Sequence, residues 1–120
     1  MRIYIAGPMT GIPYFNFPLF NKVAEELRAQ GHEVFNPAER DRERHGGVDI
    51  SANNPAGSPE LAAQEHQFSL RDALADDTAY ICKTADAIYM LPGWESSLGA
   101  RAEHALSLVL KHKFIYHKEA

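Results

Sequence analysis

The sequence predicts an α/β domain, because short apolar segments of strand type alternate along the chain with longer segments of helical periodicity. Three strand-like segments, residues 2–6, 33–36 and 86–91, stop at a Gly or a Pro, and residues 114–116 form a fourth. Such alternation is typical of a parallel sheet with helices on both faces. We therefore expect a Rossmann-like (flavodoxin-like) parallel sheet of four to five strands flanked by helices, with the strand order 2-1-3-4.

The predicted helices follow from apolar residues at helical spacing and from start and stop signals. The first helix begins after Asn16, a candidate N-cap, and ends at Gly31. Residues 59–83 have a helical pattern in two pieces, and residues 98–111 form a final helix. Residues 38–57 lack periodicity and carry a run of charges, so we expect a solvated loop there.

Length and composition bound the class of protein. The 120 residues suit a single domain, residues 1–120, and 45% hydrophobic with 23% charged residues is an ordinary globular composition. The one cysteine, Cys82, excludes an internal disulfide and a cysteine-based metal cluster, and its apolar helical surroundings predict a buried side chain. We therefore expect a cytoplasmic protein.

Charge and hydropathy narrow the range of partners. A net charge of −4 suits a small-molecule ligand better than a nucleic-acid polymer, which needs a concentrated basic surface. No apolar run has the length of a membrane helix, and the apolar start is too short for a signal peptide. The 6 histidines are scattered without metal-ligand spacing. We expect no membrane, no metal and no cofactor.

Two glycine-containing loops follow the first and third strands, residues 7–11 and 92–99. For the expected strand order, the carboxyl ends of these two strands flank the point where the order reverses, which is where such sheets bind ligands. Gly7 and Gly11 allow the backbone to approach a ligand, and Thr10 offers a hydroxyl between them. The sequence therefore predicts one cleft between the two loops.

The second loop leads directly into the last helix. Ser96 or Ser97 is placed to cap that helix, whose free N–H groups and positive dipole end attract an anion. Trp94 is a candidate to stack on a base or, alternatively, to cover the apolar end of the sheet. The start of this helix is therefore a candidate binding site for a phosphate group of the ligand.

Glu103 is the carboxylate that this geometry brings to the cleft. Side chains on a helix lean toward its N-terminus, so Glu103 projects back over Gly99 and Ala100, two small residues that leave open space. A capping box would need the glutamate three residues after the cap, and Ser107 at i+4 offers no ion pair. Glu103 is therefore a candidate functional carboxylate.

These residues resemble the nucleoside 2-deoxyribosyltransferase superfamily, which includes base-exchanging transferases and 2′-deoxynucleoside 5′-monophosphate N-glycosidases. The resemblance is carried by Tyr4-Ile-Ala-Gly-Pro-Met-Thr-Gly11 and by Leu91-Pro-Gly-Trp-Glu-Ser-Ser-Leu-Gly-Ala-Arg-Ala-Glu103. The chain is similar above all to an uncharacterised bacterial and phage branch of this superfamily. The resemblance covers nearly the whole chain outside residues 38–57. The resemblance implies the same fold and cleft.

The resemblance also implies roles for individual residues. Glu103 falls on the family's nucleophile, which attacks the anomeric carbon as in retaining glycosidases. Asp77 is the better match to the acid that assists departure of the nucleobase, but its spacing to the third strand differs by one residue, so Asp76 stays open. Ser97 matches a phosphate-binding serine, and Tyr4 matches a tyrosine at the strand end.

Departures from the family pattern leave the substrate open. Pro8 and Thr10 replace a serine and an arginine of the monophosphate glycosidases, and Arg101 replaces a small glycine and is a candidate to compensate. The transferases carry an aspartate where this chain has Ser97. Phosphorylated and unphosphorylated substrates therefore both stay open as alternatives. The substrate-binding candidates are Tyr4, Gly7, Pro8, Met9, Thr10, Gly11, Trp94, Ser97, Gly99 and Arg101.

The expected function is cleavage of the N-glycosidic bond of a (deoxy)nucleoside or its 5′-monophosphate, with water or a second base as acceptor. One alternative is a non-catalytic nucleotide-binding or sensing module. Another is a phosphoribohydrolase of the lysine-decarboxylase-like family, although the loop at residues 91–94 lacks that family's second glycine. The resemblance further implies a homodimer or larger homo-oligomer, with the apolar residues 12–17 as a candidate contact that is equally suited to the chain's own core.

Overall fold

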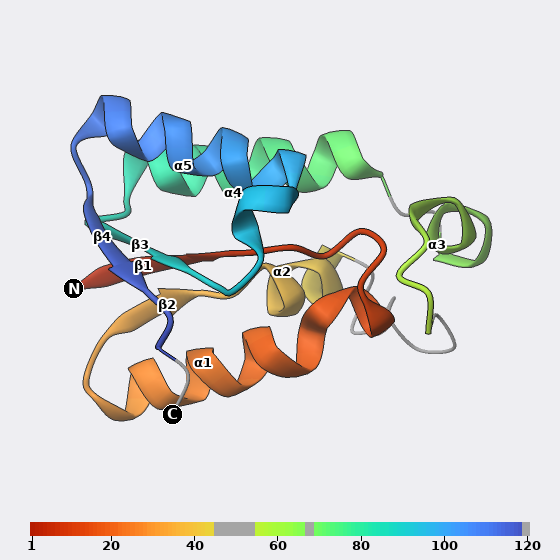
Figure 1. Cartoon of the computed structure of the whole chain (residues 1–120), viewed down its shortest axis with the longest axis horizontal. Helices are drawn as coiled ribbons and strands as arrows, with labels where there is room; N and C mark the ends of the chain where they lie inside the picture. Colours follow the sequence, from red (N-terminus) through yellow and green to blue (C-terminus); the bar gives the residue numbers. More distant parts are fainter. Residues whose placement is uncertain (45–54, 67–68, 119–120) are drawn as a thin grey trace.

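A parallel sheet lies at the centre of the structure (Figure 1), a computed structural model that describes residues 1–44, 55–66 and 69–118. Four strands pair in the order β2-β1-β3-β4, and every neighbouring pair is parallel. This confirms the predicted fold class and strand order. The strands are β1 (Arg2–Ala6), β2 (Glu33–Phe35), β3 (Ala87–Met90) and β4 (Lys113–Tyr116).

Helices cover both faces of the sheet (Figure 1). One face carries α1 (Phe17–Ala29) and α2 (Pro37–Arg44), and the other carries α4 (Leu70–Lys83) and α5 (Leu98–Leu110). The short helix α3 (Pro59–His66) lies beyond the carboxyl ends of the strands. Two 3-10 turns complete the elements, η1 (Pro13–Asn16) after β1 and η2 (Trp94–Ser96) after β3.

Alternating side chains of each strand pack into two separate apolar clusters. Ile3 and Ile5 of β1 face α1, whereas Tyr4 and Ala6 face α4 and α5. Burying one large apolar side chain contributes about 1.5–3 kcal/mol, so these clusters account for the pairing of helices with sheet faces. Tyr4 is thereby fixed on the α4/α5 side, the side on which Glu103 also lies.

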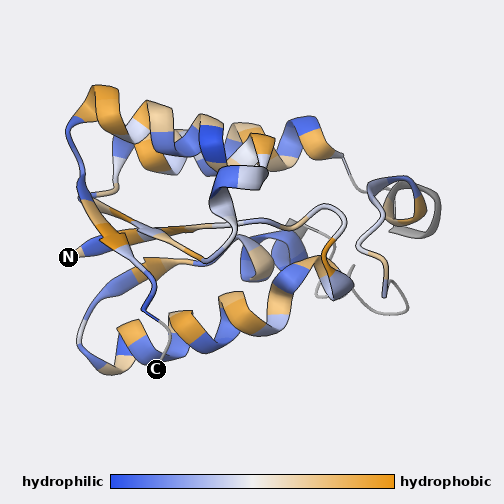
Figure 2. Ribbon diagram, in the orientation of Figure 1, coloured by the Kyte–Doolittle hydropathy of each residue, from blue (hydrophilic) through white to orange (hydrophobic). Residues whose placement is uncertain are grey.

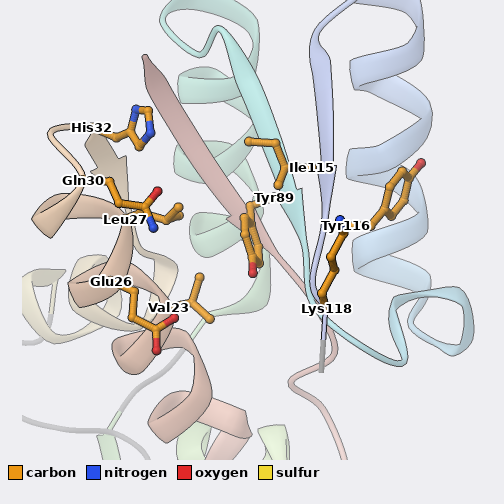
Figure 3. A pocket seen from close by; sticks show the side chains of 9 residues that line it. All are labelled: Val23, Glu26, Leu27, Gln30, His32, Tyr89, Ile115, Tyr116 and Lys118. Carbon is orange, nitrogen blue, oxygen red and sulfur yellow. The ribbon is translucent and has the colours of Figure 1, made fainter. Parts of the chain in front are cut away.

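The α1 side of the sheet is covered incompletely toward its β4 edge. A groove of about 300 Å³ lies there between α1 and strands β3 and β4, and Tyr89 and Ile115 form part of its wall (Figure 3). The Tyr89 hydroxyl is hydrogen-bonded to Nδ1 of His117 at 2.8 Å. This groove lies on the opposite sheet face from Tyr4 and is distinct from the predicted cleft.

The expectation of a solvated loop over residues 38–57 was wrong in its first part, because residues 37–44 form α2. The buried Asn36 side chain starts this helix by accepting the Ala38 N–H at 3.0 Å, and Pro37 occupies the first turn. The charges form ion pairs on its outer side, with Arg28 binding Glu39 at 2.6 Å. The expectation for residues 45–54 lies outside the described residues.

Two smaller expectations differ from the structure in part or in full. Asn16 occupies the N-cap position of α1, as predicted, but its side chain makes no capping hydrogen bond: its backbone is left-handed with φ of 62°, and its Nδ2 donates to the Pro8 carbonyl at 3.1 Å. Cys82 is exposed, because its neighbour Ile81 takes the core position at the end of α4. In the suggested contact segment, Phe15 and Phe17 are buried in the chain's own core.

The end of β1 makes a prediction about glycine. A Cβ on Gly7 would lie 2.6 Å from Cβ of Leu91, whereas a Cβ on Gly99 would meet no atom within 4 Å. We expect Gly7→Ala to lower the free energy of unfolding by about 1–3 kcal/mol through overpacking. The matched control, Gly99→Ala, lies in the first turn of α5 and should leave the free energy of unfolding unchanged or raise it by up to about 1 kcal/mol. Urea unfolding of both variants checks this, and equal stabilities would contradict the packing account.

Candidate functional site

The two glycine-containing loops meet at the carboxyl ends of β1 and β3. Gly93 lies against Pro8, since a Cβ on Gly93 would be 3.5 Å from Pro8 Cγ, and Gly7 packs directly on Leu91. The first loop is fixed from its other side, because the Gly11 N–H donates to the Gly57 carbonyl at 2.9 Å. The structure therefore brings the loops together as the strand order predicts.

The second loop ends in a capped helix start. Ser97 has extended backbone angles, and its Oγ accepts the Ala100 N–H at 3.2 Å. The first intrahelical bond of α5 runs from the Arg101 N–H to the Ser97 carbonyl, so the N–H groups of Leu98 and Gly99 precede the hydrogen-bonded ladder. Of the two candidate serines, Ser97 is the N-cap, and open space lies above Gly99.

A buried hydrogen bond joins Tyr4 of β1 to Glu103 of α5. The Tyr4 hydroxyl donates to Oε2 of Glu103 at 2.5 Å, and the two residues are 1% and 5% exposed. Glu103 shares the inward face of α5 with Ala100 and Ser107. The Glu103 carboxyl group is thus fixed to the sheet, because Tyr4 of β1 binds its Oε2 atom.

Burial dominates the electrostatics of this pair. The pKa of Glu103 is raised from 4.5 to about 8, because desolvation disfavours the carboxylate and the nearby charge of Asp77 adds to the effect, against the hydrogen bond from Tyr4. The pKa of Tyr4 is raised well above 10.0 by burial and by the charges of Glu103 and Asp77. Perturbed acids of this kind gather at functional sites more often than elsewhere.

The two candidate acids of α4 have different surroundings. Asp77 is 7% exposed and close enough to raise the pKa of both Tyr4 and Glu103. Asp76 is only partly buried and forms an ion pair with Arg40 of α2 at 3.3 Å. The buried positions of α4 are Ala73, Asp77 and Ile81, so i, i+4 spacing was a sequence signal that separates the two aspartates.

An aromatic support under Tyr4 was not identified from the sequence. The rings of Tyr4 and Phe35 stack with their centroids 5.5 Å apart, and Phe35 in turn contacts Tyr80 of α4 at 4.6 Å. These contacts join β1, β2 and α4 next to Tyr4, which with Asp77 and Glu103 forms what we call the carboxyl cluster. Strand alternation, which puts Phe35 on the same sheet face as Tyr4, was the available signal.

The remaining candidates divide between the cleft and its surroundings. The Trp94 ring stacks on His104 with centroids 4.2 Å apart, so one of its faces is already occupied. Met9 packs against the cluster on the α1 side, and Thr10 is exposed. Arg101 is exposed, and helical spacing places it on the opposite side of α5 from Glu103. The structure does not bring Arg101 to the carboxyl cluster.

Comparison with known proteins gives a family without an assigned activity. The model of the domain of unknown function DUF4406 matches residues 1–116. No curated protein and no solved structure matches the chain. Within the described parts of the chain, no three His, Cys, Asp or Glu residues are arranged to hold a metal ion. Each helix described is too short or too polar to cross a lipid bilayer.

The buried carboxyl group predicts a pH-dependent stability. Because the pKa of Glu103 in the folded chain is raised to about 8, the folded state holds a proton that the unfolded state loses above pH 4.5. Relative to Glu103→Gln, wild type should lose stability as the pH rises from about 4.5 to 8, by a few kcal/mol at ~1.4 kcal/mol per pKa unit. Urea unfolding of both proteins across this range checks it; a pH-independent difference would contradict it.

Proposed function

Given that the chain belongs to the DUF4406 family of domains of unknown function, we propose that it cleaves the N-glycosidic bond of a (deoxy)nucleoside or nucleoside 5′-monophosphate. The observation that carries the proposal is the buried Glu103 carboxyl, held at 2.5 Å by Tyr4 with Asp77 beside it. The resemblance of both site loops to the nucleoside 2-deoxyribosyltransferase superfamily supports the same chemistry. Water or a second base is the acceptor.

In the first step, Glu103 acts as the nucleophile. Tyr4 binds Oε2 of Glu103, which leaves Oε1 to form a bond to the anomeric carbon. The bond from that carbon to the base nitrogen breaks, its electron pair goes to the base, and Asp77 supplies the proton. The product of this step is a glycosyl ester on Glu103, as in retaining glycosidases.

In the second step, Asp77 reverses its role. The Asp77 carboxylate removes a proton from water, whose oxygen bonds to the anomeric carbon while the ester bond to Glu103 breaks. A second base attacking through nitrogen would regenerate a nucleoside by the same route. The pair of carboxyl groups therefore needs one proton in all, and in the reactive form that proton is on Asp77.

The anion-binding potential of α5 bears on the substrate class. The N–H groups of Leu98 and Gly99 and the dipole of the helix favour an anion beside the open space at Gly99. A 5′-phosphate would suit that position, and a nucleoside hydroxyl would also fit. The proposal includes a homodimer or larger homo-oligomer, because the resemblance implies that a neighbouring subunit completes the cleft.

Base release tests the proposed roles directly. On a panel of deoxynucleosides and their monophosphates, wild type should release free base, measured by chromatography. Glu103→Gln should reduce turnover by several orders of magnitude, because the amide cannot form the ester. Asp77→Asn should also reduce it strongly, whereas the matched control Asp76→Asn alters the ion pair with Arg40 and should stay near wild type.

Two outcomes would contradict this assignment. Turnover retained in Glu103→Gln would remove the nucleophile, and loss in Asp76→Asn but not Asp77→Asn would move the acid. If nucleosides or nucleotides bind but no compound of the panel releases its base, the result would instead favour the non-catalytic binding or sensing module.

The pH dependence of the reaction tests the shared proton. The pKa of Glu103 is raised to about 8, and its ionisation removes the one proton that the mechanism shares between Glu103 and Asp77, so kcat/KM of wild type should fall above that pH for want of an acid. In Asp77→Asn no essential proton remains to be lost, and the residual kcat/KM should instead rise as Glu103 ionises. Rates measured from pH 5 to 10 distinguish the two slopes. Parallel profiles in the two proteins would contradict the shared-proton mechanism.

A further inference from the structure

Strand β4 is an edge of the sheet whose outer side is open to a further strand. In the strand order β2-β1-β3-β4, β4 pairs with β3 on one side, and within the described parts of the chain no strand pairs with its other side. An open edge offers backbone N–H and C=O groups to a partner in extended conformation. Peptide recognition by strand addition uses edges of this kind.

Alternate residues of β4 direct their backbone groups to that open side. The N–H groups of Lys113 and His117 donate to backbone carbonyls within residues 86–90, at 3.2 and 2.9 Å, so these two residues face β3. Because the direction of the backbone groups alternates along a strand, Phe114 and Tyr116 present their N–H and C=O groups to the outside. A partner strand beside β4 would therefore bind at these two residues.

The groove of Figure 3 lies beside this edge, on the α1 side of the sheet. Its apolar lining comes from α1, β3 and β4 and consists of Val23, Leu27, Tyr89 and Ile115. Ile115 is the central β4 residue on this face, so a residue of an added strand next to Ile115 would extend toward the groove. Glu26 on the α1 wall disfavours a carboxylate inside the groove. The side chain that fits there is aliphatic or aromatic.

Basic residues flank the apolar centre of β4. Residues 111–118 have the sequence Lys-His-Lys-Phe-Ile-Tyr-His-Lys, with three lysines and no acidic residue, in a chain whose net charge is −4. All three lysines are exposed, and Figure 2 shows hydrophilic segments before and after the apolar part of the strand. A partner with apolar residues between acidic ends complements this pattern. A second copy of β4 does not, because lysines would face lysines across the edge.

We infer that the outer edge of β4, together with the groove beside Ile115, binds an extended peptide in which apolar residues are flanked on both sides by aspartate or glutamate. Backbone hydrogen bonds at Phe114 and Tyr116 hold the added strand, one apolar side chain enters the groove, and Lys113 and Lys118 bind the acidic ends. The inference does not depend on the proposed reaction, because the edge and the groove include none of the proposed catalytic residues.

Fluorescence anisotropy of labelled synthetic peptides tests this surface on the whole chain. The probe is a peptide with a Val-Ile-Val centre and two aspartates at each end. It should bind saturably, and at least about ten-fold more tightly than a peptide with the same centre and lysines at both ends. The acidic peptide with N-methyl groups along its centre should bind at least about ten-fold more weakly, because it lacks the N–H groups that pair with an edge.

Two substitutions at Tyr116 isolate the backbone contact. Both Tyr116→Pro and Tyr116→Ala remove the half-exposed ring, but only proline removes the outward N–H, and an edge strand tolerates proline where its N–H faces solvent. Tyr116→Pro should bind the acidic peptide about ten-fold more weakly than Tyr116→Ala, with equal helical circular dichroism in both. If Tyr116→Pro does not fold, the N-methylated peptide tests the same hydrogen bonds from the side of the partner.

Charge reversal tests the ends of the strand. Lys113→Glu and Lys118→Glu should each weaken binding of the acidic peptide about ten-fold and strengthen binding of the lysine-ended peptide. The matched control Lys83→Glu changes an exposed lysine at the end of α4, on the other sheet face, and should bind as wild type does.

Four results would overturn the proposal. They are no saturable binding of the acidic peptide, equal binding by Tyr116→Pro and Tyr116→Ala, undiminished binding of the N-methylated peptide, and tighter binding of a labelled DNA strand than of the acidic peptide. Self-association that Tyr116→Pro abolishes, measured by light scattering without any peptide binding, would assign the edge to a second copy of the chain and would overturn it as well.

Discussion

The hydrogen bond between Tyr4 and Glu103 is the interaction on which the site depends. It joins the central strand to α5 through two side chains that water scarcely reaches, at 2.5 Å. Ionising the buried Glu103 carboxyl costs free energy, and the hydrogen bond from Tyr4 offsets only part of that cost. The pKa of Glu103 is therefore raised to about 8. A fold optimised for stability alone would replace Glu103 with an apolar residue of similar size. Its presence therefore directs attention to function.

The rest of the fold serves to hold this pair in place. Strand alternation turns Tyr4 toward α4 and α5, and Phe35 and Tyr80 support its ring from below. The contact between Gly7 and Leu91 lets β1 and β3 end side by side, so that the loops that follow them meet. Each of these contacts comes from a different segment of the chain. The site is thus a product of the parallel topology rather than of any one motif.

The sequence predicted those parts of the structure that apolar periodicity encodes. Three of the four strands were recognisable as apolar runs closed by Gly or Pro, and Glu103 was recognisable because two small residues at the start of its helix leave open space beside it. Helix α2 was missed because its buried positions are filled by Pro37, Ala38 and the polar Asp41, so no apolar stripe marks it. Its start depends on a hydrogen bond from Ala38 to the side chain of Asn36, which periodicity does not register.

Contacts between distant segments were beyond sequence reasoning for a different reason. The i, i+4 spacing of α4 places Asp77 and not Asp76 on the buried side, but the ion pair of Asp76 with Arg40 joins two helices that are distant in the chain, so the sequence could not predict it. The stacking of Trp94 on His104 likewise depends on how η2 folds back over α5. In both cases the residue types were noticed, and their orientation required the folded chain.

The central claim is that Glu103 forms a covalent bond to the substrate, and its most direct test is mass spectrometry of acid-quenched protein. Wild type would be mixed with a nucleoside or nucleotide from which it releases base, quenched during turnover and digested. The account predicts that the peptide containing Glu103 gains the mass of the glycosyl group, and that Glu103→Gln shows no such gain. Base release with no adduct, or an adduct on a different residue, would contradict it.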